Sequence, residues 1–200
     1  MDLFSGIITL VILIFSAILH EVAHGFVAER FGDPTARLAG RLTLDPRKHI
    51  DLFMSILLPL TLFLSGSPVI FGGAKPVPID PFNLKEGRKD VALVSLAGPL
   101  TNILIAILAS FLFKLAPSNL LAIVVQLNLL LAIFNLIPIP PLDGSKIFSL
   151  ILPEKLANAF LSLGSIGIFI IFFLLLSGGE LSLGRLIFSL LSFSEKLLGL

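Results

Sequence analysis

The stretch that decides the fold is FSAILHEVAHGFVAERFG, Phe15 to Gly32. The 17 residues from Leu3 to Leu19 carry no charge, and this run continues directly into His20, Glu21 and His24. About 20 apolar residues form a helix long enough to cross a bilayer. Ionisable side chains in such a helix are costly, so three of them at its end indicate a functional site.

The composition places the whole chain in a membrane. Of its residues, 56% are hydrophobic and 14% are charged, and the mean hydropathy is +1.06. Soluble domains carry about a quarter charged residues. The opening residues contain Asp2 and no Lys or Arg, so they lack the basic region of a signal peptide, and we expect the first apolar run to be retained. The chain has no cysteine, which excludes thiolate ligands and a disulfide framework.

Further charge-free runs indicate the layout of the chain. Four of them, each 23 to 28 residues long, are Leu52–Ala74, Val91–Phe113, Leu115–Leu142 and Leu156–Gly179. A last segment, Leu181–Ser194, contains Arg185 and is the weakest candidate. We therefore predict an all-α polytopic membrane protein, a bundle of about 4–6 transmembrane helices. It is expected to be one membrane-embedded domain over residues 1–200, with a catalytic core at about 1–150 and C-terminal helices at about 156–198.

The segments between the apolar runs favour non-helical structure. ARLAGRLTL, Ala36 to Leu44, alternates Leu with other residues around Gly40, which predicts a short β-hairpin at about 35–44. FGGAKPVPIDPFN, Phe71 to Asn83, contains three prolines, and each proline restricts its predecessor to extended conformations. We expect the hairpin or an extended re-entrant segment to lie near the active site, where an edge could accept an unwound peptide.

The pair His20 and His24 is typical of a metal site. Residues i and i+4 share one face of a helix, and H-E-x-x-H allows two imidazoles to hold one tetrahedral zinc ion. Glu21 is then placed to act on the water at the metal as a general base. The alternative reading is an ordinary pair of histidines at a helix end near the membrane interface.

A catalytic zinc ion needs a third protein ligand, either His49 or a carboxylate. The best-placed carboxylate is Asp143, in FNLIPIPPLDGSKIF, where it closes a long charge-free run. Pro, Asp and Gly are also the usual residues of a turn at a helix end. Because the histidines require a partner at membrane depth, we favour Asp143, and we interpret His49 as a loop residue or a residue that supports a ligand.

Three motifs together resemble the site-2 protease family of intramembrane zinc metalloproteases. They are HEVAH, AGPLTN (Ala97–Asn102) and NLIPIPPLDG (Asn135–Gly144), in this order. GRLTLDPRKHID and GGAKPVPID resemble the compact subgroup that lacks PDZ and CBS domains. The resemblance covers about residues 15–150.

The resemblance implies a function and a role for each residue. It implies one Zn²⁺ per chain on His20, His24 and Asp143, with Glu21 as general base, and regulated intramembrane proteolysis of membrane-protein substrates. Asn135 matches an Asn that helps to hold the substrate backbone. Asn102 either lines the active-site cavity or forms a bond between helices. The alternative function is a metal-ion or proton transporter, which would more often spread its ionisable groups over several spans.

The ligands also predict a topology. His24 and Asp143 end different apolar runs and must meet on one side, which requires that Leu52–Ala74 dips into the membrane and returns. This arrangement places 12 Lys and Arg residues on the active-site side and 2 on the other. The positive-inside rule then puts the site toward the cytoplasmic face, in the prokaryotic cell (inner) membrane.

The expected partners are a transmembrane protein substrate and membrane lipid, with no nucleic acid. Basic residues of the connecting segments are interpreted as contacts to lipid headgroups; these residues are Arg47, Lys48, Lys85, Arg88 and Lys89. The oligomeric state is not indicated by the sequence.

Overall fold

The regular structure is helical throughout the described part of the chain. The computed structural model describes residues 3–57, 60–61, 64, 74–176 and 182–200. Its α-helices are α1 (Leu3–Arg30), α2 (Thr35–Leu38), α4 (Arg88–Leu115), α5 (Asn119–Asn135), α6 (Asp143–Phe148), α7 (Glu154–Leu161), α8 (Gly164–Leu176) and α9 (Leu183–Leu198). Short turns of other helix types are η1 (Pro46–Lys48), η2 (Leu52–Leu57), η3 (Pro81–Asn83) and η4 (Ser149–Ile151).

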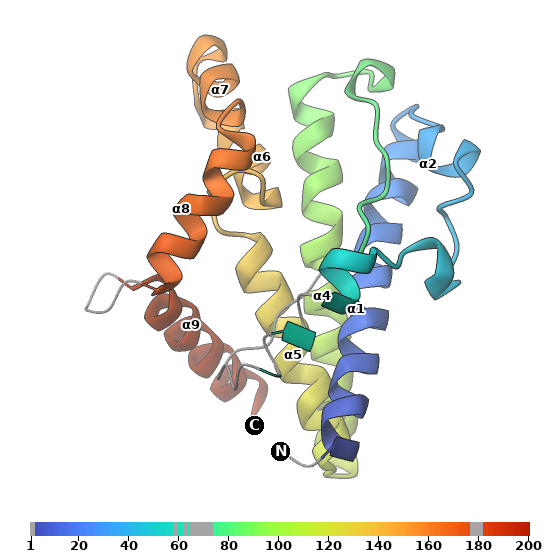
Figure 1. Ribbon diagram of the computed structural model, residues 1–200, viewed down its shortest axis with the longest axis vertical. Coiled ribbons are helices and arrows are strands. Elements are labelled where there is room, and N and C mark those ends of the chain that lie inside the picture. Colours follow the sequence, from blue (N-terminus) through green and yellow to red (C-terminus); the bar gives the residue numbers. More distant parts are fainter. Residues whose placement is uncertain (1–2, 58–59, 62–63, 65–73, 177–181) are drawn as a thin grey trace.

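Three long helices form the centre of the bundle (Figure 1). Helix α4 runs antiparallel to α1 and α5 and packs against both of them. Its buried positions are mostly small, including Ala97, Gly98 and Ala106, and small residues let neighbouring helices approach closely within a membrane. Helix α9 packs along α5, and its residues Leu191 and Leu198 contact the buried cluster of Ala106, Ala109, Val125 and Leu129.

Two helices, Phe4–Arg30 and Arg88–Leu115, are long and apolar enough to cross a membrane. The pair Glu154–Leu161 and Ile166–Leu175, bent by 72°, would count as a third span. The described residues therefore give two or three candidate spans, and the predicted 4–6 spans are not found among them. One reason is that the charge-free run 115–142 holds only a 17-residue helix, α5, because Pro117 precedes it and the prolines from Pro138 onward end it.

The predicted hairpin at 35–44 is wrong. Thr35–Leu38 form helix α2, a turn with a positive φ of 63° follows at Gly40, and the described residues contain no strand. Local bonds account for this difference. The Thr35 N–H donates to the Asp33 carboxylate, and the Arg41 N–H donates to the Ala36 carbonyl, so the segment closes on itself.

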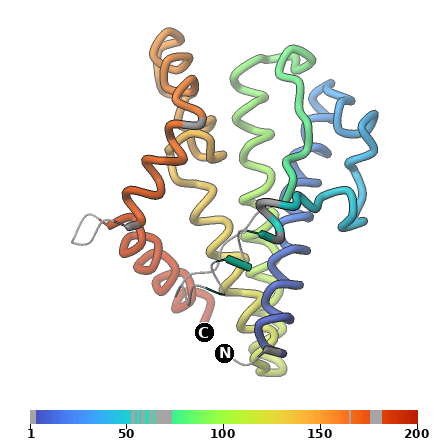
Figure 2. The backbone as a smooth tube through the Cα atoms, in the orientation of Figure 1, coloured from blue at the N-terminus to red at the C-terminus, as the bar shows by residue number. Residues whose placement is uncertain are grey.

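Residues 74–80 form no helix and lie against α1, where the Val77 N–H reaches Glu21. The predicted re-entry of 52–74 falls largely outside the described residues. The structure does describe both ends of the connection from α1 to α4. One buried cluster joins Ala28 of α1, Val94 of α4 and Leu84, which precedes α4. The chain therefore leaves α1 and enters α4 at the same end of the bundle (Figure 2).

Candidate metal centre

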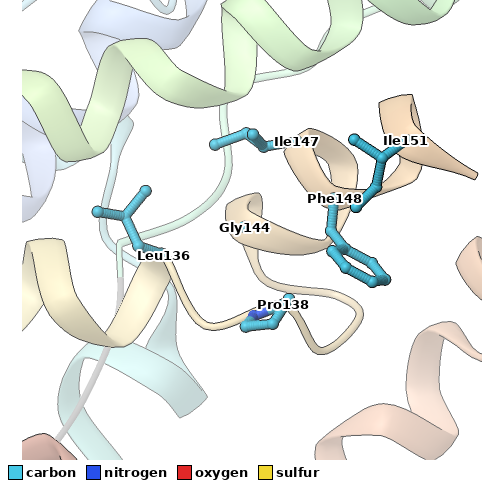
Figure 3. Close-up of a pocket in the computed structure, with 6 residues that line it drawn as sticks. All are labelled: Leu136, Pro138, Gly144, Ile147, Phe148 and Ile151. Carbon is cyan, nitrogen blue, oxygen red and sulfur yellow. The ribbon is translucent and has the colours of Figure 1, made fainter.

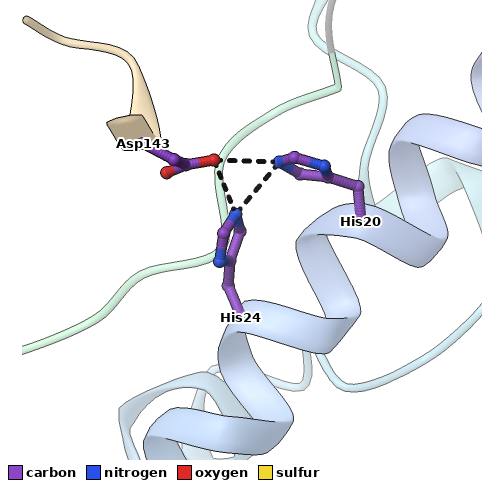
Figure 4. Close-up of side chains that lie close together, drawn as sticks. All are labelled: His20, His24 and Asp143. Carbon is purple, nitrogen blue, oxygen red and sulfur yellow. Dashed lines mark hydrogen bonds and ion pairs between the residues drawn. The ribbon is translucent and has the colours of Figure 1, made fainter. Parts of the chain in front are cut away.

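Three side chains from two distant parts of the chain converge on one point (Figure 4). The Asp143 Oδ2 atom lies 3.1 Å from the Nε2 atoms of both His20 and His24. The two Nε2 atoms lie 3.0 Å apart. All three side chains are buried, and they form the one possible metal-binding group of His, Cys, Asp or Glu side chains found among the described residues.

Helical spacing and a tight turn bring these side chains together. His20 and His24 are one turn apart on α1, and Asp143 is the first residue of α6. The turn before α6 folds back so closely that a Cβ on Gly144 would lie 2.2 Å from the Leu136 carbonyl oxygen. Only glycine fits there, so the LDG sequence is what lets Asp143 reach back toward α1.

Helix α4 forms the wall of the site at Gly98. A Cβ at this position would lie 2.5 Å from the Nε2 atoms of both His20 and His24. The missing side chain therefore leaves space beside these two Nε2 atoms. The AGPL sequence thus has a direct steric role at the site, in addition to allowing the close approach of α1 and α4.

The hydrogen bonds of the two rings determine which nitrogen carries the proton. The Nδ1 atom of His24 faces the Val94 carbonyl oxygen at 2.7 Å, and Nδ1 of His20 faces the Asn102 Oδ1 at 2.6 Å. Both partners are acceptors, so each neutral ring is protonated on Nδ1 and presents a lone pair on Nε2. Two lone pairs and a carboxylate oxygen then meet with no proton between them, an arrangement that a bound cation makes favourable.

The donor set and its spacing fit zinc. Zinc in proteins takes imidazole nitrogen and carboxylate oxygen at about 2.0–2.2 Å in tetrahedral geometry, which separates the ligand atoms by about 3.3 Å. The observed separations of 3.0 to 3.1 Å are within a few tenths of an ångström of this value. The second carboxylate oxygen of Asp143 is held by the Lys146 ammonium at 3.2 Å, so one oxygen remains for the ion.

Glu21 lies on α1 between the two histidines and is not a member of the converging group. Its Oε2 atom accepts a hydrogen bond of 2.9 Å from the Val77 N–H. The carboxylate is only partly buried, unlike the side chains of His20, His24 and Asp143. The extended segment 74–80 therefore holds this carboxylate at the edge of the site.

The other predicted residues have different surroundings. Asn102 is fully buried and contacts His20 directly, which the sequence alone left undecided. The Asn135 amide donates to the Leu131 carbonyl of its own helix at 2.9 Å and is not brought into the converging group. His49 is also outside that group, and its Nε2 atom lies 2.8 Å from the Thr43 carbonyl oxygen.

Two buried polar residues of the site were missed by the sequence analysis. Asn128 of α5 is fully buried and bonds to Asn102, and Ser16 of α1 bonds to Asn128. The available signal was the presence of an amide in the middle of an apolar helix, which requires a hydrogen-bonding partner. Which partner it finds is set by the contact between helices and could not be read from spacing.

An apolar hollow lies next to the site (Figure 3). It has a volume of about 310 Å³ and is lined by Leu136, Pro138, Gly144, Ile147, Phe148 and Ile151. Gly144 directly follows Asp143, so the hollow adjoins the helix that supplies the carboxylate. Its lining is suited to apolar groups.

Comparison with known proteins agrees with this geometry. The profile of peptidase family M50 matches residues 8–118 and 111–177, most of the chain. YwhC of Bacillus subtilis strain 168, a candidate zinc metalloprotease, is 38% identical over 177 residues, with 82% of this chain and 77% of YwhC covered. No solved structure gives a significant match.

More distant relatives have the same description. Rip2 of Mycobacterium tuberculosis strain H37Rv, also a candidate zinc metalloprotease, is 35% identical over 155 residues, and the match covers 70% of this chain but only 56% of Rip2. MJ0611 of Methanocaldococcus jannaschii is 32% identical over 146 residues, which cover 70% of this chain and 69% of MJ0611. The chain therefore belongs to peptidase family M50, the site-2 protease family of zinc metalloproteases, as its motifs predicted.

Proposed function

We propose that the chain is an intramembrane metalloprotease that hydrolyses peptide bonds in or near the transmembrane segments of membrane proteins. The observation that carries the proposal is the meeting of two histidine nitrogens and one carboxylate oxygen within 3.1 Å of one another, on a helix long enough to cross a membrane. A buried site of this kind, next to the partly buried Glu21 carboxylate, is suited to metal-assisted hydrolysis.

In this proposal His20, His24 and Asp143 hold the zinc ion. Zinc bound there would supply positive charge to polarise a substrate carbonyl and to lower the pKa of a water molecule. Asp143 contributes a negative charge, and Lys146 keeps its second oxygen occupied. Gly98 leaves the space in which the ion and a reacting group would lie.

Glu21 is proposed to act as the general base and then as the general acid. It would take a proton from the attacking water and return it to the leaving nitrogen. Its contact with the Val77 N–H supports this role, because that bond fixes the carboxylate without burying it. A peptide paired along residues 74–80 would lie beside this carboxylate, and Asn135 is proposed to help hold its backbone.

The proposed substrate is a membrane protein with a transmembrane helix, and surrounding lipid is the second partner. The carbonyls of such a helix are protected by internal hydrogen bonds. A bond in it is cleaved only after local unwinding, which an extended binding segment would stabilise. The cut would release a membrane-held domain, as regulated proteolysis requires.

Replacement of Glu21 tests this function. In Glu21→Gln, the amide cannot take a proton from water, so we expect cleavage of a single-pass membrane substrate to fall by about 10²- to 10⁴-fold. Zinc content should stay at one ion per chain. The matched control is Glu29→Gln on the same helix, an acid that pairs with Arg37 away from the site, and this variant should keep its activity. Near-normal turnover in Glu21→Gln would contradict the role.

The active site is proposed to face the cytoplasm, because a topology in which 52–74 returns without crossing would put 12 of the 14 Lys and Arg residues on its side. The chain contains no cysteine, so single cysteines can be introduced at Lys85 and at Ser118. An impermeant thiol reagent outside intact cells should label Ser118→Cys and leave Lys85→Cys unlabelled. The reverse pattern would mean that residues 52–74 cross the membrane or that the whole orientation is inverted, and either result would contradict the proposed topology.

A further inference from the structure

We propose that Asn128 is a positioning residue that fixes the protonated nitrogen of His20 through Asn102. By this account Asn128 keeps the lone pair of His20 on Nε2, toward the metal, although it contacts neither the ion nor the substrate. The inference rests on the proposed function only in taking His20 as a ligand. It concerns three helices, because His20 is on α1, Asn102 on α4 and Asn128 on α5.

The first step is the orientation of the Asn128 amide. Its Nδ2 atom donates to the Val124 carbonyl at 2.9 Å and to the Ser16 hydroxyl oxygen at 3.0 Å. A backbone carbonyl is only an acceptor, so it requires the NH₂ group of Asn128 on its side. The oxygen Oδ1 of Asn128 must therefore point the other way, toward Asn102.

The second step carries this orientation to Asn102. The Asn128 Oδ1 accepts from the Asn102 Nδ2 at 2.9 Å, and the same Nδ2 lies 3.4 Å from the Ser16 carbonyl oxygen. The contact to Ser16 is at the limit of a hydrogen bond, whereas the shorter contact, to Asn128, places the NH₂ group of Asn102 on this side. Its oxygen is then directed at His20, whose Nδ1 lies 2.6 Å away.

The third step is the ring itself. Opposite the Asn102 oxygen, Nδ1 of His20 must carry the proton, and Nε2 is left free for the metal. If the Asn102 amide turned over, its NH₂ group would face Nδ1, and the proton of the neutral ring would move to Nε2. Such a ring cannot bind the ion until it changes tautomer, and outer contacts of this kind typically change metal affinity by about 10- to 100-fold.

The second histidine provides an internal reference. Nδ1 of His24 faces the Val94 backbone carbonyl at 2.7 Å, which no substitution at Asn102 or Asn128 reverses. The tautomer of His24 is therefore independent of the amides. The proposal predicts an effect on one ring and none on the other, which a general loosening of the helices would not produce.

The test is ¹⁵N NMR of the histidine rings in metal-free protein, at a pH where the rings are neutral. The chain has only three histidines, so the signals can be assigned with single substitutions. In the unaltered protein we expect the proton on Nδ1 of both His20 and His24. In Asn128→Leu we expect His20 to populate the Nε2–H form while His24 stays unchanged, and zinc affinity in a chelator competition should fall by about 10- to 100-fold.

The matched control is Ser16→Ala, which removes a bond of Asn128 but leaves the Val124 carbonyl in place. This variant should retain the Nδ1–H form of His20 and zinc affinity within about threefold. An unchanged His20 signal in Asn128→Leu would overturn the proposal, as would equal changes at both rings. If Asn128→Leu does not fold, Asn128→Ala is measured in its place. An Nε2–H form of His20 in the unaltered protein would also overturn the proposal, whatever the variants do. The NMR result does not depend on proteolysis, so a protein without protease activity leaves the test intact.

Discussion

Two buried carboxylates of this protein have opposite surroundings. Asp33, in the turn after α1, accepts hydrogen bonds from the N–H of Thr35 at 3.0 Å, the N–H of Asp80 at 2.7 Å and the Asn83 amide at 3.0 Å. The Thr35 hydroxyl also donates to it. Asp143 faces two imidazole Nε2 atoms, which in neutral rings are acceptors because each Nδ1 faces an oxygen.

The difference separates a structural carboxylate from the carboxylate of the proposed metal site. Around Asp33, donors from its own turn and from residues 80–83 converge on the carboxylate, so its hydrogen bonding is complete and ties the two segments together. Around Asp143, acceptors outnumber donors on the side that faces the histidines. A buried excess of acceptors is unfavourable unless a cation is present, so the balance of donors and acceptors distinguishes the two sites better than burial does.

Removal of the ligand carboxylate should have the largest effect. In Asp143→Ala, the ion would lose a ligand and the only negative charge of the group, so we expect zinc affinity to fall by more than about 100-fold, beyond the effect of an outer contact. Zinc content after dialysis measures this. The control is His49→Ala, which should keep its zinc. Full zinc in Asp143→Ala with loss in His49→Ala would show that His49 is the third ligand.

Filling the space beside the ligands should have the next largest effect. In Gly98→Ala the new methyl group would lie 2.5 Å from both Nε2 atoms, so the rings must move, and we expect zinc affinity to fall by about 10- to 100-fold. The control is Gly184→Ala in α9, where the nearest side-chain or backbone atom is 3.5 Å away. That variant should bind zinc normally. Equal zinc affinity in both variants would mean that the site adapts to the methyl group.

Replacement of the structural carboxylate should have the smallest effect on the metal. Burial raises the pKa of Asp33, but hydrogen bonds from Thr35, Asn83 and the Asp80 N–H outweigh it and hold the pKa below its ordinary value. A lowered pKa in the folded state means that Asp33 contributes stability at neutral pH and that this contribution is lost as the pH falls through the folded pKa.

Asp33→Asn should therefore lower the free energy of unfolding by about 1–3 kcal/mol at pH 7, and the loss should shrink in acid. Thermal unfolding in detergent at several pH values measures both effects. Zinc content should remain normal. Asp45→Asn is the control, because the Asp45 side chain is 38% exposed and should contribute less. A loss of zinc in Asp33→Asn would show that the turn and the metal site are coupled.

The ligands of the site could be proposed from the sequence because chemistry restricts them strongly. HEVAH places two imidazoles on one helical face, and without cysteine few partners remain. The network behind His20 could not be proposed, because the contact of Asn102 with Asn128 depends on how α4 and α5 pack. The hairpin failed because alternation around Gly40 does not reveal that Asp33 and Ala36 close the segment locally. The predicted 4–6 spans are not confirmed among the described residues, where the charge-free run 115–142 holds only a 17-residue helix because the prolines after Asn135 end α5.

The sequence separation of the ligands has a mechanical consequence. His24 and Asp143 are 119 positions apart, so an ion held by both would act as a cross-link that closes a large ring of the chain. By analogy with disulfides, a cross-link that closes a ring of about 100 residues lowers the entropy of the unfolded chain and stabilises the folded state by about 4.7 kcal/mol. This ring contains all of α4 and α5. A chelator would therefore remove the cross-link between α1 and α6 as well as the reactive centre. The melting temperature should follow zinc occupancy even in a variant that cannot cleave.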